Sequence, residues 1–102
     1  MTRCRTLSTP VNATSLDGTR PGSPIFISWI DAHHVASEWL DLDEIDNDLC
    51  RVQSVGFYVR STKDQIIYAS DWSEKDEDEV HVNSVSAIPF GCIVEIIIME
   101  AE

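Results

Sequence analysis

The side chains of this sequence that could bind a cation or a partner are mainly acidic, and many of them lie in two segments. Residues 41–48 read Asp-Leu-Asp-Glu-Ile-Asp-Asn-Asp, and residues 74–79 read Glu-Lys-Asp-Glu-Asp-Glu. Carboxylates this dense attract cations and the Lys- and Arg-rich surfaces of other proteins. The residues predicted to bind a partner are Trp39, Asp41, Asp43, Glu44, Asp46, Asp48, Glu74, Asp76, Glu77, Asp78 and Glu79.

Trp39 is the predicted anchor of this site. It lies in an expected loop just before the first acidic segment, whereas Trp29 and Trp72 fall in strand-like runs and are expected in the core. An exposed aromatic ring within a charged rim is a common binding anchor. The alternative is that both acidic segments are simply solvated loops.

The metal-binding interpretations fail on spacing. His33 and His34 are adjacent, so in an extended segment their side chains point in opposite directions. A calcium loop starting at Asp41 needs an oxygen ligand at its fifth position and glycine at its sixth, where this chain has Ile45 and Asp46. We therefore predict no metal and no cofactor.

Catalysis is also disfavoured, because acid–base work needs a carboxyl group held in an apolar pocket and acids in runs normally face water. Asp31 and Asp71, each beside a tryptophan, and Glu95, between apolar residues, are the exceptions, and strand ends or a rim explain them equally well. No nucleophile motif or phosphate-binding glycine loop is present. The chain is predicted not to be an enzyme.

The charge is divided unevenly along the 102 residues. Residues 1–24 hold three arginines and one aspartate, a balance of +2, while residues 25–102 hold four basic and seventeen acidic residues, a balance of −13. Direct nucleic-acid binding is therefore disfavoured, since it needs cations to displace counterions from phosphates. A protein with a basic surface is the expected partner, and an oligomer is left open.

Three cysteines, an odd number without close spacing, together with the absence of an apolar leader or membrane span, suggest an intracellular protein with reduced thiols. Cys50 and Cys92 stand among apolar residues and are expected to be buried.

Short runs of β-branched and aromatic residues must position these side chains. Gly56 interrupts the second run, where a sharply bent strand needs a residue without Cβ, and the last run is apolar on both faces, as in a strand covered on each side. Leu42 and Ile45 are expected to pin the first acidic loop to the body. Strands are predicted at residues 25–30, 49–61, 65–72, 80–88 and 93–99, with helical turns at 38–40, capped by Ser37, and at 89–92.

This layout predicts a mainly all-β fold, a small five-stranded SH3-like or Sm-like open barrel with one short helical turn before the last strand. An open β-sandwich or an α+β fold is the alternative. Residues 25–102 are the expected barrel domain. Residues 1–24, broken by prolines and glycines, are expected to form an extended N-terminal arm.

From Ile27 to Ile98 the chain resembles a loose group of short bacteriophage proteins. The matching pattern is an opening Trp-x-Asp, a second Trp about ten residues on, a strand ending Val-Gly-Phe, Tyr or Trp, a strand of the Leu-x-Leu-Ala-x type, and Ile-Pro-x-x-x-Ile near the C-terminus. The matching segments are Trp29–Asp31, Trp39, Val55–Phe57, Ile66–Ser70 and Ile88–Ile93. The resemblance implies a phage source and an accessory role in the host cytoplasm, and it supplies no activity to transfer.

Three functions follow as expectations. The leading one is a noncatalytic accessory protein whose acidic loops bind, and inhibit, a host defence or nucleic-acid-handling complex. The second is a virion subunit, a head-decoration or tail-associated protein whose arm contacts its neighbours. The third is a sponge that sequesters a nucleotide in a cationic pocket, which would draw on Arg51, Arg60, His33 or His81.

Overall fold

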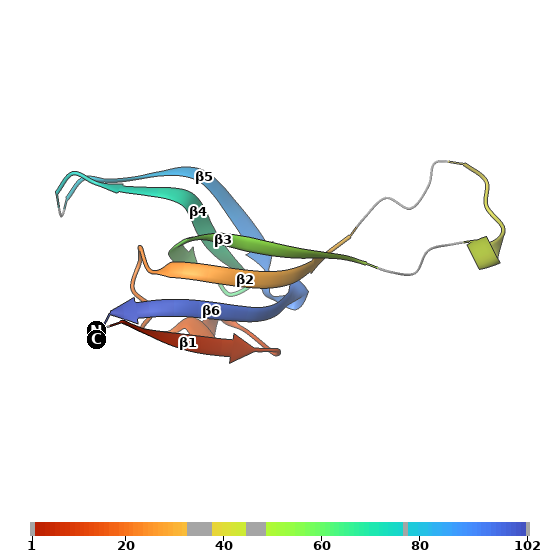
Figure 1. The fold of residues 1–102 in the computed structure, drawn as a ribbon, viewed down its shortest axis with the longest axis horizontal. Coiled ribbons are helices and arrows are strands. Elements are labelled where there is room, and N and C mark those ends of the chain that lie inside the picture. Colours follow the sequence, from red (N-terminus) through yellow and green to blue (C-terminus); the bar gives the residue numbers. More distant parts are fainter. Residues whose placement is uncertain (1, 33–37, 45–48, 77, 102) are drawn as a thin grey trace.

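The chain forms one antiparallel β-sheet, shown in the computed structural model of Figure 1. Its six strands lie in the order β1-β6-β2-β3-β4-β5. The structure describes residues 2–32, 38–44, 49–76 and 78–101. Within them the strands and 3₁₀ helices (η) are β1 Thr2–Ser8, η1 Ala13–Leu16, β2 Pro24–Asp31, η2 Leu42–Glu44, β3 Cys50–Ser61, β4 Gln65–Glu74, β5 Val80–Pro89, η3 Phe90–Cys92 and β6 Ile93–Ala101.

The predicted all-β class is confirmed, and β2 to β6 coincide with the five predicted runs. The tight helical turn before the last strand is confirmed as η3. The helical turn predicted over residues 38–40 is wrong, because these residues form no helix and the 3₁₀ turn in the described part of this connection is η2; the proposed cap, Ser37, lies outside the described residues. The strand number is corrected from five to six, because the segment expected as an arm contributes β1.

Residues 2–23 are part of the sheet and its core rather than an arm. β1 pairs with β6 from Thr2 opposite Ala101 to Ser8 opposite Glu95. Because β6 lies between β1 and β2, it is covered on both edges, and the chain after β1 returns across the core, where Val11 and Leu16 are buried. The isoleucine-rich strand β6 therefore pairs with an N-terminal segment that is itself poor in apolar residues.

Arg5 fastens this segment through polar contacts. Its Nη2 donates a hydrogen bond of 2.7 Å to Oγ1 of Thr19, which is itself buried. Its Nε lies 2.8 Å from Oε1 of Glu100, an ion pair in which the N–H is not aligned with the oxygen. Arg3 approaches the same carboxylate at 3.5 Å. Part of the positive charge near the N-terminus is thus neutralised on the sheet.

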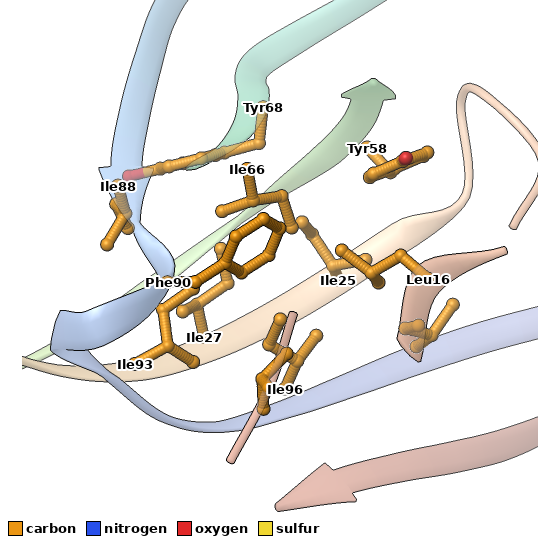
Figure 2. Packing of buried hydrophobic residues seen from close by; sticks show 12 residues of the cluster. Leu16, Ile25, Ile27, Tyr58, Ile66, Tyr68, Ile88, Phe90, Ile93 and Ile96 are labelled. Carbon is orange, nitrogen blue, oxygen red and sulfur yellow. The ribbon is translucent and has the colours of Figure 1, made fainter. Parts of the chain in front are cut away.

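The hydrophobic core lies inside the curve of the sheet, as Figure 2 shows. Ile27, Ile66, Ile96 and Ile98 are the largest fully buried side chains. They come from β2, β4 and β6, so strands far apart in the sheet order meet around one core. The other members of the core are Val11, Leu16, Ile25, Tyr58, Tyr68, Ile88, Phe90 and Ile93.

Gly56 makes the curvature possible. A Cβ at this position would lie 2.5 Å from the carbonyl oxygen of Ala69 and 2.8 Å from the ring of Tyr68. The predicted need for a residue without Cβ in β3 is therefore confirmed. The curvature does not bring the two edge strands, β1 and β5, into pairing within the described residues, so the sheet ends at both of them.

Two projections extend from opposite ends of this body (Figure 1). One is the described part of the connection between β2 and β3, residues 38–44. The other is the outer half of the β4–β5 hairpin, where Asp71–Glu74 pair only with β5 because β3 stops pairing with β4 at Ala69. The molecule measures 58 × 25 × 24 Å, and the start of β1 lies beside the end of β6.

Candidate partner-binding site

The described part of the β2–β3 connection, residues 38–44, exposes two large apolar side chains. Trp39 is fully exposed, beyond the partial exposure expected of it, and Leu42 is 89% exposed. The prediction that Leu42 pins this loop to the body is wrong, because the loop reaches away from the sheet and offers Leu42 no apolar surface to cover it. Ile45, the second predicted pin, lies outside the described residues.

Three described carboxylates lie next to the two apolar side chains in the sequence of this loop. Asp41, Asp43 and Glu44 are all exposed, and a hydrogen bond of 3.0 Å from the Glu44 amide to the Asp41 carbonyl closes η2 between them. No lysine or arginine of the described chain forms a salt bridge with any of the three. Asp46 and Asp48 lie outside the described residues.

The second acidic segment is the tip of the β4–β5 hairpin. Asp76 accepts hydrogen bonds from the Glu79 amide at its carbonyl, 3.2 Å, and from the Asp78 amide at Oδ1, 2.8 Å. Lys75 is exposed and lies 3.9 Å from the Glu79 carboxylate. One lysine thus faces the exposed carboxylates of Glu74, Asp76, Asp78 and Glu79, while Glu77 lies outside the described residues.

The fold does not bring the two acidic segments together. Figure 1 places residues 38–44 and the β4–β5 tip at opposite ends of the long axis of 58 Å. This distance exceeds the screening length of about 8 Å in physiological salt several times over, so their fields act separately. The protein presents two anionic ends, of which only the β2–β3 loop carries an exposed tryptophan.

The prediction that Trp29 and Trp72 lie in the core is wrong for Trp72, which is outside the core cluster, and holds only in part for Trp29, which packs against it. Trp29 is half-buried and donates a hydrogen bond of 3.0 Å to Oγ of Ser54. Trp72 is half-buried and donates one of 3.2 Å to Glu74. Its ring also packs against Gly22. Only Trp39 has its whole ring free to enter a partner.

The acidic and metal-ligating side chains singled out in the sequence are mostly exposed where the structure describes them. No three His, Cys, Asp or Glu side chains in the described part of the chain gather closely enough to hold a metal ion; His33 and His34 lie outside it. Asp31 and Asp71 are exposed, and Glu95 is half-buried between Ser8 and Ser28 on the neighbouring strands.

The cysteine prediction needs correction. All three cysteines are free, but Cys50 is exposed and Cys92 is half-buried, whereas both were expected in the core. Cys50 opens β3 beside the projecting loop, so its apolar sequence neighbours do not surround it in space.

The members of the cationic pocket of the sponge hypothesis that the structure describes do not lie together, and His33 lies outside the described residues. Arg51 and Arg60 lie on the same strand nine residues apart, which corresponds to about 30 Å in an extended chain. Both are exposed, and His81 is exposed on the distant hairpin. A nucleotide could not contact these groups together.

One groove was not foreseen from the sequence. It has a volume of about 440 Å³ and is lined by Arg20, Pro21, Gly22, Pro24, Trp72, Met99 and others between β4 and the end of β6. Only long-range folding brings these residues together, since the prolines stand fifty residues before the tryptophan. Their spacing therefore carries no local signal.

Comparison of the chain with protein-family models, with curated proteins and with solved structures found no match. In the part of the chain that the structure describes, every helix is a short 3₁₀ turn, and none has the length and apolar character needed to cross a membrane.

Proposed function

We propose that this protein is a noncatalytic interaction protein that binds a basic protein surface through the acidic β2–β3 loop, with Trp39 as the anchor. The observation that carries the proposal is the full exposure of Trp39, together with Leu42, among carboxylates that no cation of the described chain neutralises. The acidic tip of the β4–β5 hairpin provides a second, separate anionic surface.

Two physical effects favour binding at this loop: burial of exposed apolar surface and electrostatic steering. A tryptophan and a leucine left in water gain free energy when a partner covers them, at about 25 cal/mol for each Å² of apolar surface buried. The surrounding carboxylates speed the encounter with a positive surface, and large aromatic residues at the centre of an interface commonly dominate its energy. Trp39 and Leu42 in an acidic rim combine both effects.

The biological role that we propose is that of a phage accessory protein in the host cytoplasm. A projecting anionic end is shaped to occupy a groove that otherwise holds nucleic acid, so the proposed partner is a host defence or nucleic-acid-handling complex and the proposed effect is inhibition. The resemblance of residues 27–98 to short phage proteins supports the source, and the charge of −13 on residues 25–102 supports the choice of a basic partner.

We also propose an SH3-like origin for the sheet. In support of it, β2 pairs with both β3 and β6, a long connection separates β2 from β3, and a 3₁₀ turn precedes the last strand. β1 is then an additional strand laid on β6. The virion alternative gains no support, because the arm that it requires is engaged with its own sheet.

The test is capture from a lysate of candidate host cells, followed by titration of the identified partner at rising salt. Trp39→Ala is expected to weaken binding about tenfold or more, because it removes the anchor. Neutralising Asp41, Asp43 and Glu44 together is expected to slow association and flatten the salt dependence.

Val55→Ala is the matched control, since Val55 is an exposed apolar residue of β3 outside the loop. Its affinity should equal that of the wild type. Binding that is indifferent to salt, or that survives both loop variants unchanged, contradicts the proposal.

A further inference from the structure

Among the described residues, no strand pairs with the outer edge of β5. β5 is the last strand in the sheet order and pairs only with β4, from Val80 opposite Glu74 to Pro89 opposite Gln65. In a ladder of this kind alternate residues direct their N–H and C=O groups away from the neighbour. Figure 1 shows β5 along the outside of the projecting hairpin, where no other described segment approaches it.

This edge also lacks the usual protection against pairing. Natural edge strands are blunted by charged side chains, proline or bulges. Between Val80 and Ile88 β5 has no lysine, arginine, aspartate or glutamate, and its only proline is the last residue. Ser84, with a φ of 54°, interrupts the strand and leaves Val80–Asn83 as a regular segment next to the hairpin tip.

The side chains of this segment suit an incoming strand. Val80 and Val82 point to the same side and remain 38% and 40% exposed, so they offer an apolar strip beside the free backbone groups. Addition of an extended peptide to such an edge uses main-chain hydrogen bonds for affinity and alternate side chains for specificity.

The charge next to the edge selects the occupant. The tip, residues 74–79, holds five acidic residues and one lysine, and it adjoins the start of β5 directly. A strand that pairs with Val80–Asn83 therefore meets a strongly negative field at one end. A second copy of this chain is a poor occupant, since it carries the same tip and a net charge of −11.

We propose that β5 docks an extended, lysine- or arginine-rich segment of a partner protein, which adds to the sheet as a seventh strand along Val80–Asn83. This inference rests on the proposed function in one respect, that the partner is basic. It adds the mode of recognition and places it on the hairpin rather than on the loop that carries Trp39.

The test uses a peptide of alternating lysine and valine, six residues long, acetylated and amidated, as a probe of the intact protein. Two further versions carry N-methyl groups on the lysines or on the valines. All three have the same charge, but each methylated version loses the N–H groups of one edge. If the strand adds to β5, one methylated version should lose at least about tenfold in affinity and the other should bind like the parent.

A protein variant locates the contact. Val82→Lys should abolish binding of the parent peptide, while Thr6→Lys, an equal change of charge at an exposed position of the opposite edge strand, should leave it unchanged. Circular dichroism establishes that both variants are folded.

Equal binding by all three peptides would mean ion pairing alone and would overturn strand addition, although the proposed function would stand. No binding by any peptide would also overturn it. Sedimentation velocity of the protein alone tests whether a second copy of the chain occupies the edge. A dimer that Val82→Lys dissociates would assign the edge to self-association and overturn the proposal. Failure of the proposed function itself would appear in the Trp39 variant, which this experiment does not use.

Discussion

Removal of residues 2–23 is expected to abolish cooperative folding of this protein. The deletion takes away β1, which pairs with β6 along seven residues, and removes Val11 and Leu16 from the core. It leaves β6, the most apolar strand, as a bare edge. A loss of a few kcal/mol in the free energy of unfolding is enough to unfold the protein, because a domain of this size is stable by only about 5–15 kcal/mol.

Leu16→Ala isolates the core part of this effect. Leu16 is 2% exposed, and truncating a buried leucine costs about 2–5 kcal/mol in the free energy of unfolding. Urea denaturation followed by circular dichroism measures both changes. Thr6→Ala, at an exposed position of β1, should change little and serves as the control. A truncated protein as stable as the full chain would show that residues 2–23 are a free arm after all.

Gly56→Ala is expected to destabilise the sheet strongly although it adds only one methyl group. The new methyl group would lie 2.5 Å from the Ala69 carbonyl oxygen, closer than a Cβ atom can approach. That oxygen cannot yield easily, because Ala69 is buried and sits in register with Phe57 and Val85 on both neighbouring strands. We expect a loss of about 3 kcal/mol in unfolding free energy, at the upper end for overpacked cores.

Gly91→Ala is the matched control for this substitution. A Cβ at Gly91 would meet no atom within 4 Å, and its backbone is not in the left-handed region. Its unfolding free energy should stay within about 0.5 kcal/mol of the wild type, as for surface changes generally. Equal midpoints for the two alanine variants in thermal denaturation would contradict the close approach of β3 and β4.

The strands that the sequence predicts are those with their own apolar periodicity. β2, β3 and β6 are rich in isoleucine, valine and aromatic residues, and their local pattern is enough. β1 reads Thr-Arg-Cys-Arg-Thr-Leu-Ser and has no such pattern. It becomes a strand because β6 has a second edge available for pairing, and β1 pairs with it from Thr2 opposite Ala101 to Ser8 opposite Glu95. The local sequence of residues 1–24 gives no information about that distant edge.

The candidate site shows the same division. The position of Trp39 next to the acidic segment of the β2–β3 connection predicts that its side chain is exposed, and the structure confirms this exposure. Leu42 was predicted to be covered because apolar residues usually are, yet the reach of the loop decides its exposure. The separation of the two acidic segments depends on sheet order and hairpin length, which composition does not contain.

The pairing of Thr2 with Ala101 puts both ends of the chain at one corner of the molecule. A tag or surface anchor fused at either end would hold the protein in nearly the same orientation, with the Trp39 loop directed away from the support. A short linker could also join the two ends, and the chain could then be reopened within the β2–β3 connection. Such a circularly permuted protein would keep every strand of the sheet while cutting the loop that carries Trp39.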